Sequence, residues 1–285
     1  MYQPNLSLKK KLEELVAPSS VKFSLGKNTI ALITGGSRGF GWELALQLAK
    51  KNVNVIIADI VSPPCFQPPQ NNIAYYKCNV ANNRSIRDLR AWIKERYGNV
   101  NILFNNAGVV YISSLEDSTD RDIKKVIDVN YIGACMMIEI FLPDIIESRN
   151  GYIVNIASVL GMVSPARIAS YGASKAGLIA YHDSLSQRLK KSKTSGVRAL
   201  LVCPGKLKTE MFARVKTPSK LLAPDVDPKK LALQIIVAIS CNSTSSLNSP
   251  YYVNLVPIIK NLSWPYLRIL KTLSGMDRST AIPAK

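Results

Sequence analysis

Tyr171 and Lys175 stand four residues apart in the segment SYGASK, and Ser158 lies 13 positions before the tyrosine. Residues four apart on a helix project from one face, so the phenol and the ammonium group are predicted to lie close together. A free tyrosine has a pKa of about 10, and a nearby ammonium group lowers that pKa by favouring the phenolate. The three side chains could therefore exchange a proton with a bound hydroxyl or carbonyl group. Because a solvated helix face can carry the same Tyr/Lys pair, the interpretation depends on the rest of the chain.

A glycine-rich turn, TGGSRGFG, follows a β-branched run far upstream of this segment. The pyrophosphate of a dinucleotide needs close approach of the backbone, and it gains from the positive end of a following helix. A turn that only requires positive φ is the alternative interpretation. The next strand ends in a carboxylate, as dinucleotide-binding βαβ units require. We therefore predict a dinucleotide site that includes Gly35, Ser37, Arg38, Gly39, Phe40, Gly41 and Asp59.

The choice between NAD and NADP depends on two side chains of opposite charge. Asp59 can accept both hydroxyl groups of the adenosine ribose, and it repels a 2′-phosphate at close range. Arg38 could instead pair with that phosphate. We give Asp59 more weight, so the sequence favours NAD and leaves NADP open.

Alternating strand and helix patterns predict the elements that position these residues. Such βαβ units imply a parallel sheet with helices on both faces, so the predicted class is α/β with a Rossmann-type, doubly wound parallel sheet. A single domain is predicted over residues 29–240, after a basic N-terminal extension (1–28) and before a C-terminal extension (241–285). About six strands are expected, at 29–33, 52–59, 73–80, 101–108, 151–158 and 197–205. Helices are expected at 83–98, 118–148, 168–193 and 221–239, with Ser118 or Thr119 as the cap of the second.

Several separate motifs, in the right order, resemble the short-chain dehydrogenase/reductase family over roughly residues 29–212. They are Thr34-Gly35 to Gly41, the NNAG segment at 105–108, Asn130, Ser158, Tyr171 with Lys175, and Pro204-Gly205. The resemblance implies an enzyme that interconverts an alcohol and its carbonyl, with Tyr171 as the acid/base and Ser158 holding the substrate oxygen. Lys175 would bind the nicotinamide ribose, and Asn130 would hold a water that continues the proton relay. The cationic nicotinamide would add to the lysine in lowering the pKa of the tyrosine.

The resemblance also implies further cofactor contacts along the chain. Family members usually carry Asp where this chain has Asn79, whose amide oxygen can still accept a hydrogen bond from the adenine amino group. Thr209 matches a threonine that meets the nicotinamide carboxamide. The expected set is Asn79, Val80, Asn106, Ala107, Gly108, Tyr171, Lys175, Pro204, Gly205 and Thr209.

The C-terminal extension is similar to the tail of a branch of the family that is associated with membranes and lipid droplets. That branch includes 17-beta-hydroxysteroid dehydrogenase type 11 and retinal short-chain dehydrogenases, and it implies a lipophilic retinoid, steroid or long-chain substrate. Cationic residues interleaved with Trp264, Tyr266 and Leu270 suit a segment at an anionic lipid interface. A C-terminal segment that only covers the substrate cleft is an equal alternative, and residues 206–225 are expected to cover the substrate. The implied location is the cytoplasmic face of the endoplasmic reticulum membrane or a lipid droplet.

The remaining partners follow from composition. The formal net charge of +18 favours an anionic partner, but the dispersed cations and the absence of a recognition motif argue against nucleic acid. The five cysteines lack metal-like spacing, so we expect reduced core thiols and no metal, and His182 is interpreted as structural. By analogy with the family, a homodimer or tetramer is expected.

Two alternatives to a lipophilic substrate stay open at this point. One is a soluble NADPH-dependent reductase of small polar carbonyls, which Arg38 and the high charge permit. The other is a non-catalytic, cofactor-binding scaffold at a lipid surface. The intact set of Asn130, Ser158, Tyr171 and Lys175 argues against the scaffold.

Overall fold

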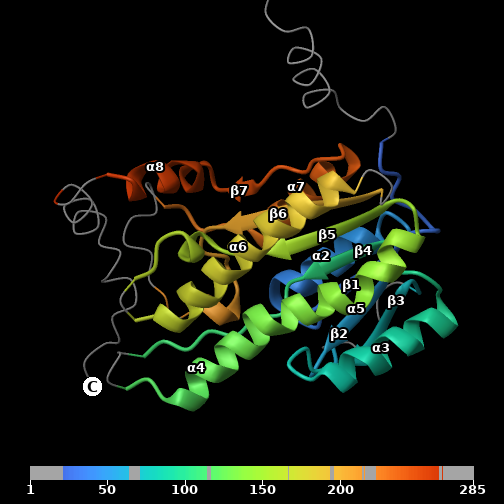
Figure 1. Ribbon diagram of the computed structural model, residues 1–285, viewed down its shortest axis with the longest axis horizontal. Helices are drawn as coiled ribbons and strands as arrows, with labels where there is room; N and C mark the ends of the chain where they lie inside the picture. Colours follow the sequence, from blue (N-terminus) through green and yellow to red (C-terminus); the bar gives the residue numbers. More distant parts are fainter. Residues whose placement is uncertain are drawn as a thin grey trace, which may run out of the picture.

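A wholly parallel, seven-stranded sheet forms the centre of the computed structural model, which describes residues 22–63, 71–113, 117–165, 167–192, 196–213, 215, 223–262 and 265. The strand order is β3-β2-β1-β4-β5-β6-β7, so the order reverses between β1 and β4 (Figure 1). The strands are β1 Ile30–Thr34, β2 Asn54–Asp59, β3 Ile73–Lys77, β4 Ile102–Asn105, β5 Gly151–Ile156, β6 Val197–Pro204 and β7 Leu247–Ser249. The predicted doubly wound α/β fold is thereby confirmed.

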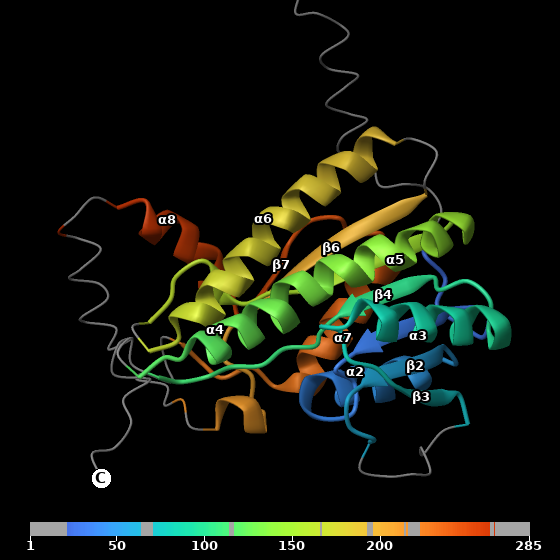
Figure 2. The ribbon, with the colours of Figure 1, turned by 60° about the horizontal axis from the view of Figure 1, so that its bottom comes forward.

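Helices cover both faces of the sheet, as Figures 1 and 2 show. The longer helices are α2 Gly39–Ala49, α3 Asn83–Arg96, α4 Asp120–Ile127, α5 Gly133–Glu147, α6 Ala169–Lys191 and α7 Pro228–Ser240. The short ones are η1 Asp128–Ile132, η2 Val159–Gly161, η3 Glu210–Phe212, η4 Tyr251–Leu255 and α8 Val256–Lys260. The buried apolar residues of α2 and α7 belong to one core cluster and those of α3 and α5 to another, while α6 contributes to both, with Tyr171 in the first and Leu185 and Leu189 in the second.

The alternation of side chains along each strand creates these two cores. In β1, Ala31 and Ile33 belong to the cluster with α2 and α7, whereas Ile30 and Leu32 belong to the cluster with α3 and α5. Successive strand residues point to opposite faces, so a strand covered on both sides must be apolar at every position. This is why the β1 sequence reads IALIT, without polar alternation.

Local signals set most helix boundaries where the sequence suggests them. Asn82 caps α3 by accepting from the amide of Ser85, and Gly98, at φ +92°, follows the end of that helix. The Thr119 side chain accepts from the amide of Asp122, which confirms one of the two predicted caps of α4. At the start of α7, Asp227 is the N-cap and Pro228 occupies the first turn.

The predicted continuous helix over 118–148 is wrong in one respect, because a π-helical turn, η1, separates α4 from α5. A π turn adds one residue to the helical ladder, and such turns often lie at functional sites. By length and mean hydropathy the run Asp120–Glu147 could span a membrane, but half of its apolar window is buried inside the domain. A core helix packed on a sheet passes the same test.

A seventh strand, β7, was not expected. It pairs in parallel with the end of β6, through Val202↔Leu247 to Pro204↔Ser249. Its sequence, LNS, is short and polar, so it carries neither an apolar run nor a clear alternation. The C-terminal extension therefore begins within the sheet, although residues 263–264 and 266–285 lie outside the described part of the chain.

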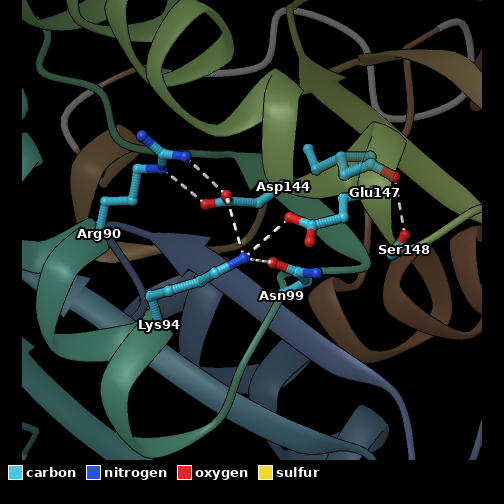
Figure 3. Close-up of polar contacts among 7 residues, drawn as sticks. Arg90, Lys94, Asn99, Asp144, Glu147 and Ser148 are labelled. Carbon is cyan, nitrogen blue, oxygen red and sulfur yellow. Dashed lines mark hydrogen bonds and ion pairs between the residues drawn. The ribbon is translucent and has the colours of Figure 1, made fainter.

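An ion-pair network joins α3 to α5 (Figure 3). The Arg90 guanidinium donates to both carboxylate oxygens of Asp144, each at 2.7 Å, and the aspartate is buried. Lys94 contacts Asn99 and donates to the Glu147 carboxylate at 2.9 Å. A bidentate pair with a buried carboxylate fixes the mutual position of the two helices.

Candidate active site

The predicted site residues gather at the carboxyl ends of the strands, next to the reversal of strand order. Gly35 follows β1, Asn106 follows β4, Ser158 lies just beyond β5, and Gly205 follows β6. Ligands of open parallel sheets bind outside the carboxyl ends of the strands, at the point where the order reverses. The fold therefore brings together segments that are far apart in sequence.

The glycine turn has the geometry that the sequence predicts. Gly35 and Gly39 have φ of +64° and +58°, which L side chains rarely adopt. At Gly41 the limit is space, because an added Cβ would lie 2.3 Å from the Gly35 carbonyl oxygen and 2.5 Å from Nδ2 of Asn106. The positive φ and the close approach thus both occur in one turn.

Two polar side chains join the glycine turn to the end of β4. Asn106 Nδ2 donates to the carbonyls of Thr34 and Gly35, at 3.0 and 2.9 Å. Thr34 Oγ1 accepts from the amides of Asn106 and Ala107, each at 3.0 Å. Thr34 was quoted as part of the glycine motif but was not counted among the site residues. The sequence signal that could have identified Thr34 is that it is a polar residue at the end of an otherwise apolar strand.

Asp59 lies against the same turn at the end of β2. Its Oδ2 accepts from the Ser37 amide at 3.0 Å, and its Oδ1 accepts from the Val61 amide at 3.3 Å. The Ser37 hydroxyl donates to the Val61 carbonyl at 2.6 Å, so the end of β2 is bound to the turn through two routes. Arg38, the N-cap residue of α2, is exposed. The acidic candidate for cofactor choice therefore binds the residue next to the basic one, but the two differ in burial.

Tyr171, Lys175 and Ser158 form a buried group at the first turns of α6. The side chains of Ser158 and Tyr171 are hydrogen-bonded, and Ser158 Oγ also accepts from the Leu160 amide at 3.1 Å. Lys175 Nζ donates to the carbonyl of Ile156 at 2.8 Å and lies 5.9 Å from the centre of the Tyr171 ring. The three predicted catalytic residues thus meet, as their spacing suggests.

Burial dominates the protonation of this group. It raises the pKa of Tyr171 to about 12, although the hydrogen bond with Ser158 acts in the opposite direction. It lowers the pKa of Lys175 to about 8, with a smaller opposing effect of Cys203. The prediction that the lysine and a cationic nicotinamide together lower the tyrosine pKa stays a prediction for the cofactor-bound state, whereas in the protein alone desolvation of the phenolate raises that pKa.

Asn130 lies in the π turn η1 and its side chain is fully engaged. Its Oδ1 accepts from the Val109 amide at 2.8 Å, and its Nδ2 donates to the Val109 carbonyl at 2.9 Å and to Ser174 Oγ at 3.1 Å. Ser174 Oγ in turn donates to the carbonyl of Tyr171 at 2.7 Å. Both amide hydrogens of Asn130 are used, which favours a positioning role for this side chain. Ser174 was not singled out, although it stands between Tyr171 and Lys175.

The expected adenine contacts lie at the other end of the site. Asn79 is exposed, and its Oδ1 already accepts from the Ala81 amide at 3.0 Å, which leaves one lone pair for a ligand. Val80 is buried. Gly108 lies near the catalytic group, since a Cβ added to it would be 3.4 Å from Asn130 Oδ1 and 3.8 Å from Lys175 Nζ.

The segment after β6 reaches both ends of the site. A Cβ at Gly205 would lie 2.5 Å from the hydroxyl of Tyr252, so η4 approaches this backbone closely. The methyl group of Thr209 lies 3.7 Å from the position of a Cβ at Gly39. Phe212 packs edge-on against Tyr171. Of the predicted cover over 206–225, residues 214 and 216–222 lie outside the described part.

His182 belongs to the core, in agreement with its structural interpretation. Its Nδ1 lies 3.2 Å from Nδ2 of Asn155, whose Oδ1 accepts from Asn105 at 2.9 Å. Burial lowers the pKa of His182 to about 4, so the ring is neutral at pH 7. The Oδ1 atom of Asn105 is buried without a hydrogen-bond partner in the described chain.

The cysteines are free where the structure describes them. Cys78 and Cys203 are buried and Cys135 is partly buried, but Cys241 is exposed, so the prediction of core thiols is wrong for Cys241. Cys65 lies outside the described residues. Within the described ranges, no group of three or more His, Cys, Asp or Glu residues could hold a metal ion.

Known proteins are similar to this chain in sequence and in fold. A family model described as short chain dehydrogenase matches residues 29–220. The chain is 50% identical over 272 residues to an uncharacterized oxidoreductase of Saccharomyces cerevisiae, with 94% of this chain and 88% of that protein covered. It is 30% identical over 230 residues to retinol dehydrogenase 10-B of Danio rerio, with 70% of this chain and 67% of that protein covered. The ligand-free aldohexose dehydrogenase of Thermoplasma acidophilum has a TM-score of 0.69 at 21% identity, over 80% of this chain and 94% of that chain, and this likeness concerns the fold alone.

Proposed function

The chain belongs to the short-chain dehydrogenase family and is an oxidoreductase of that family, and from this premise we propose that it interconverts a lipophilic alcohol and its carbonyl. The observation that carries the proposal is the buried group of Ser158, Tyr171 and Lys175 beside the glycine turn. A hydroxyl donor and a hydrogen-bonding serine, aimed at one point, suit proton transfer to or from a substrate oxygen. A non-catalytic, cofactor-binding scaffold would not require these three side chains.

The residues at the carboxyl ends of the strands fit an NAD(P) cofactor. Gly35, Gly39 and Gly41 leave the backbone bare at the start of α2, where a pyrophosphate gains from amide groups and the helix dipole. Asp59 would hold the adenosine ribose, and Lys175 the nicotinamide ribose. Bound NAD(P) supplies or accepts the hydride.

The proton moves through this chain's own side chains. Ser158 Oγ would hold the substrate oxygen, and the Tyr171 phenol would donate its proton to that oxygen during reduction or recover it during oxidation. Lys175, turned to the Ile156 carbonyl, lies close enough to the phenol to stabilise its anion. The Asn130–Ser174 pair would hold the backbone of Tyr171 in position.

Apolar surroundings and one relative support a lipophilic substrate. Partly buried side chains packed against the core cluster of Tyr171 include Val110, Tyr111, Ile112 and Leu160. A polar sugar would leave its hydroxyl groups without partners against such surfaces. A relative that is 30% identical, retinol dehydrogenase 10-B, is named for an apolar alcohol.

An exposed apolar stripe on η4 and α8 supports action at an anionic lipid surface. Tyr251 and Ile258 are 78% and 66% exposed, and Leu255, Ile259 and Leu262 complete the helical spacing. A stripe of this kind on the outside of the domain suits insertion into the headgroup region of a lipid layer. The formal charge of +18 would add attraction to anionic lipids. The endoplasmic reticulum or lipid-droplet location proposed from the tail agrees with this stripe.

Replacing Tyr171 with Phe tests the catalytic assignment. The change removes only the hydroxyl group, so kcat/KM for retinol, steroid and long-chain alcohols should fall by a factor of about 100 or more. NADH binding, measured by fluorescence titration, should stay near the wild-type affinity. Tyr152→Phe is the matched control, because this buried hydroxyl donates to the Ser243 carbonyl far from the site. Full turnover by Tyr171→Phe would contradict the assignment.

The protonation of Tyr171 predicts opposite pH dependences for the two directions. Because burial raises the pKa of Tyr171 to about 12, the phenol is protonated at neutral pH and ready to reduce a carbonyl. Oxidation needs the phenolate, whose fraction rises about tenfold per pH unit below the pKa. Between pH 6 and 7.5, below the lowered pKa of Lys175 near 8, kcat/KM should stay level for reduction and rise for oxidation. An oxidation rate that stays level over this range would argue against Tyr171 as the base.

Removing the charge of Asp59 tests the cofactor preference. The wild type should bind NAD about tenfold more tightly than NADP, because the buried carboxylate repels the 2′-phosphate. Asp59→Ala should lose this preference, measured by calorimetric titration of both cofactors. Asp59→Asn is the sharper variant, since its amide oxygen can still accept from the Ser37 amide. A wild type that prefers NADP would favour the alternative of an NADPH-dependent reductase of small polar carbonyls.

Vesicle binding tests the lipid surface. The full chain should float with vesicles that contain phosphatidylserine, and Ile258→Asp should reduce the bound fraction about tenfold. Val237→Asp is the matched control, because Val237 is equally exposed, at 61%, but lies on α7. Equal losses in both variants, or equal binding by wild type and Ile258→Asp, would contradict the assignment of the stripe.

A further inference from the structure

The ring of Phe212 covers the catalytic tyrosine. The two ring centres lie 6.0 Å apart, with the ring planes at 82°, so the edge of one ring meets the face of the other. Tyr171 is only 4% exposed, Ser158 5% and Phe212 7%. A substrate oxygen must come within hydrogen-bond distance of the Tyr171 and Ser158 hydroxyl groups. The substrate oxygen cannot do so while the side chains of Tyr171 and Ser158 are both buried.

The backbone around Phe212 is held in place at its base. Leu207 bridges to Val226, the Lys208 amide donates to the Val226 carbonyl at 3.0 Å, and the Val226 amide donates to Lys206 at 2.7 Å. The short helix η3 follows, and the Phe212 amide donates to the Thr209 carbonyl at 3.1 Å. The position of Phe212 is therefore set by a fixed base rather than by a free segment.

Phe212 alone turns inward from η3. Of the three residues of this helix only Phe212 is buried, whereas Glu210 and Met211 are exposed. Its ring joins the core cluster that contains Tyr171, Leu207 and Val226. Edge-to-face aromatic pairs add to the stabilisation that burial of the ring provides. Moving the ring away from Tyr171 therefore has a cost, and something must offset that cost when substrate binds.

We propose that Phe212 is a specificity-determining residue whose ring the substrate must displace from Tyr171. A substrate with an extended apolar group beside its carbonyl offsets the lost contacts, because the displaced ring packs against its hydrocarbon instead of against Tyr171. A small carbonyl compound has no surface with which to do so. Selection for long apolar substrates then arises from the cost of displacing the ring. This inference rests on the proposed function and names the substrate feature that the site selects.

A homologous pair of ketones tests the selection. With NADH as the reductant, wild-type kcat/KM should be far higher for 2-undecanone than for 2-butanone. Phe212→Ala removes the ring and should raise kcat/KM for 2-butanone about tenfold or more, with little change for 2-undecanone. Phe212→Leu keeps an apolar side chain, so its kcat/KM for 2-butanone should lie between the values of the wild type and of Phe212→Ala. This variant also allows the test if the alanine variant does not fold.

A second pair of rings in the same chain provides a matched control. Phe23 packs edge-on against Tyr152 at 5.2 Å and 78°, both rings are buried, and burial raises the pKa of Tyr152 to about 12, as for Tyr171. Nitration by tetranitromethane, followed by peptide mass spectrometry, reports the access to each tyrosine without any turnover. Phe212→Ala should raise nitration of Tyr171 about tenfold and leave Tyr152 unchanged, and Phe23→Ala should do the reverse.

The two measurements separate failure of the inference from failure of the proposed function. If Phe212→Ala changes neither the ketone ratio nor the nitration of Tyr171, the inference is overturned. If Phe23→Ala changes the ketone ratio as much as Phe212→Ala does, the effect is general destabilisation and the inference is again overturned. A wild type that binds NADH but reduces neither ketone contradicts the proposed function, and nitration then still decides whether Phe212 covers Tyr171.

Discussion

Two hydrogen bonds from the Asn106 amide to the carbonyls of Thr34 and Gly35 tie the end of β4 to the glycine turn. The two bonds lie where the strand order reverses, so they hold together the ends of β1 and β4 that border the site. The contact leaves no room for a Cβ at Gly41, and the same turn binds the carboxylate of Asp59 through the Ser37 amide. Backbone packing therefore determines the shape of the glycine turn at the candidate cofactor site, and the charge of Asp59 adds to it.

The catalytic end depends on burial in a different way. Desolvation keeps Tyr171 protonated, and it lowers the pKa of Lys175 to about 8, so at neutral pH a buried ammonium group lies beside a neutral phenol. Ser158 and the Ile156 carbonyl satisfy the polar atoms that burial would otherwise leave without partners. A group arranged in this way holds its single positive charge on Lys175 at neutral pH. At neutral pH the Tyr171 phenol is therefore protonated and can donate its proton.

The elements and the residues that the sequence predicts differ in how far local information determines them. Most strands of the parallel sheet could be predicted because burial on both faces makes them apolar runs, whereas the short, polar β7 could not, and the helix caps could be predicted because one side chain satisfies each. The glycine turn and the Tyr171–Lys175 spacing are similarly local. Ser174 and Thr34 could not be assigned, since their partners lie 44 and 70 or more positions away in sequence. The raised pKa of Tyr171 is a property of packing that residue spacing does not contain.

The π turn that separates α4 from α5 has a consequence for how the site tolerates change. One extra residue in a helix rotates everything beyond it by about 100°, and here that rotation directs Asn130 toward Val109 and Ser174. A deletion within Asp128–Ile132 would remove the extra residue and change the direction in which the Asn130 side chain points relative to Val109 and Ser174. The helix can therefore vary in composition more freely than in length. The number of residues between Thr119 and Gly151, and not their identity alone, holds the asparagine in the site.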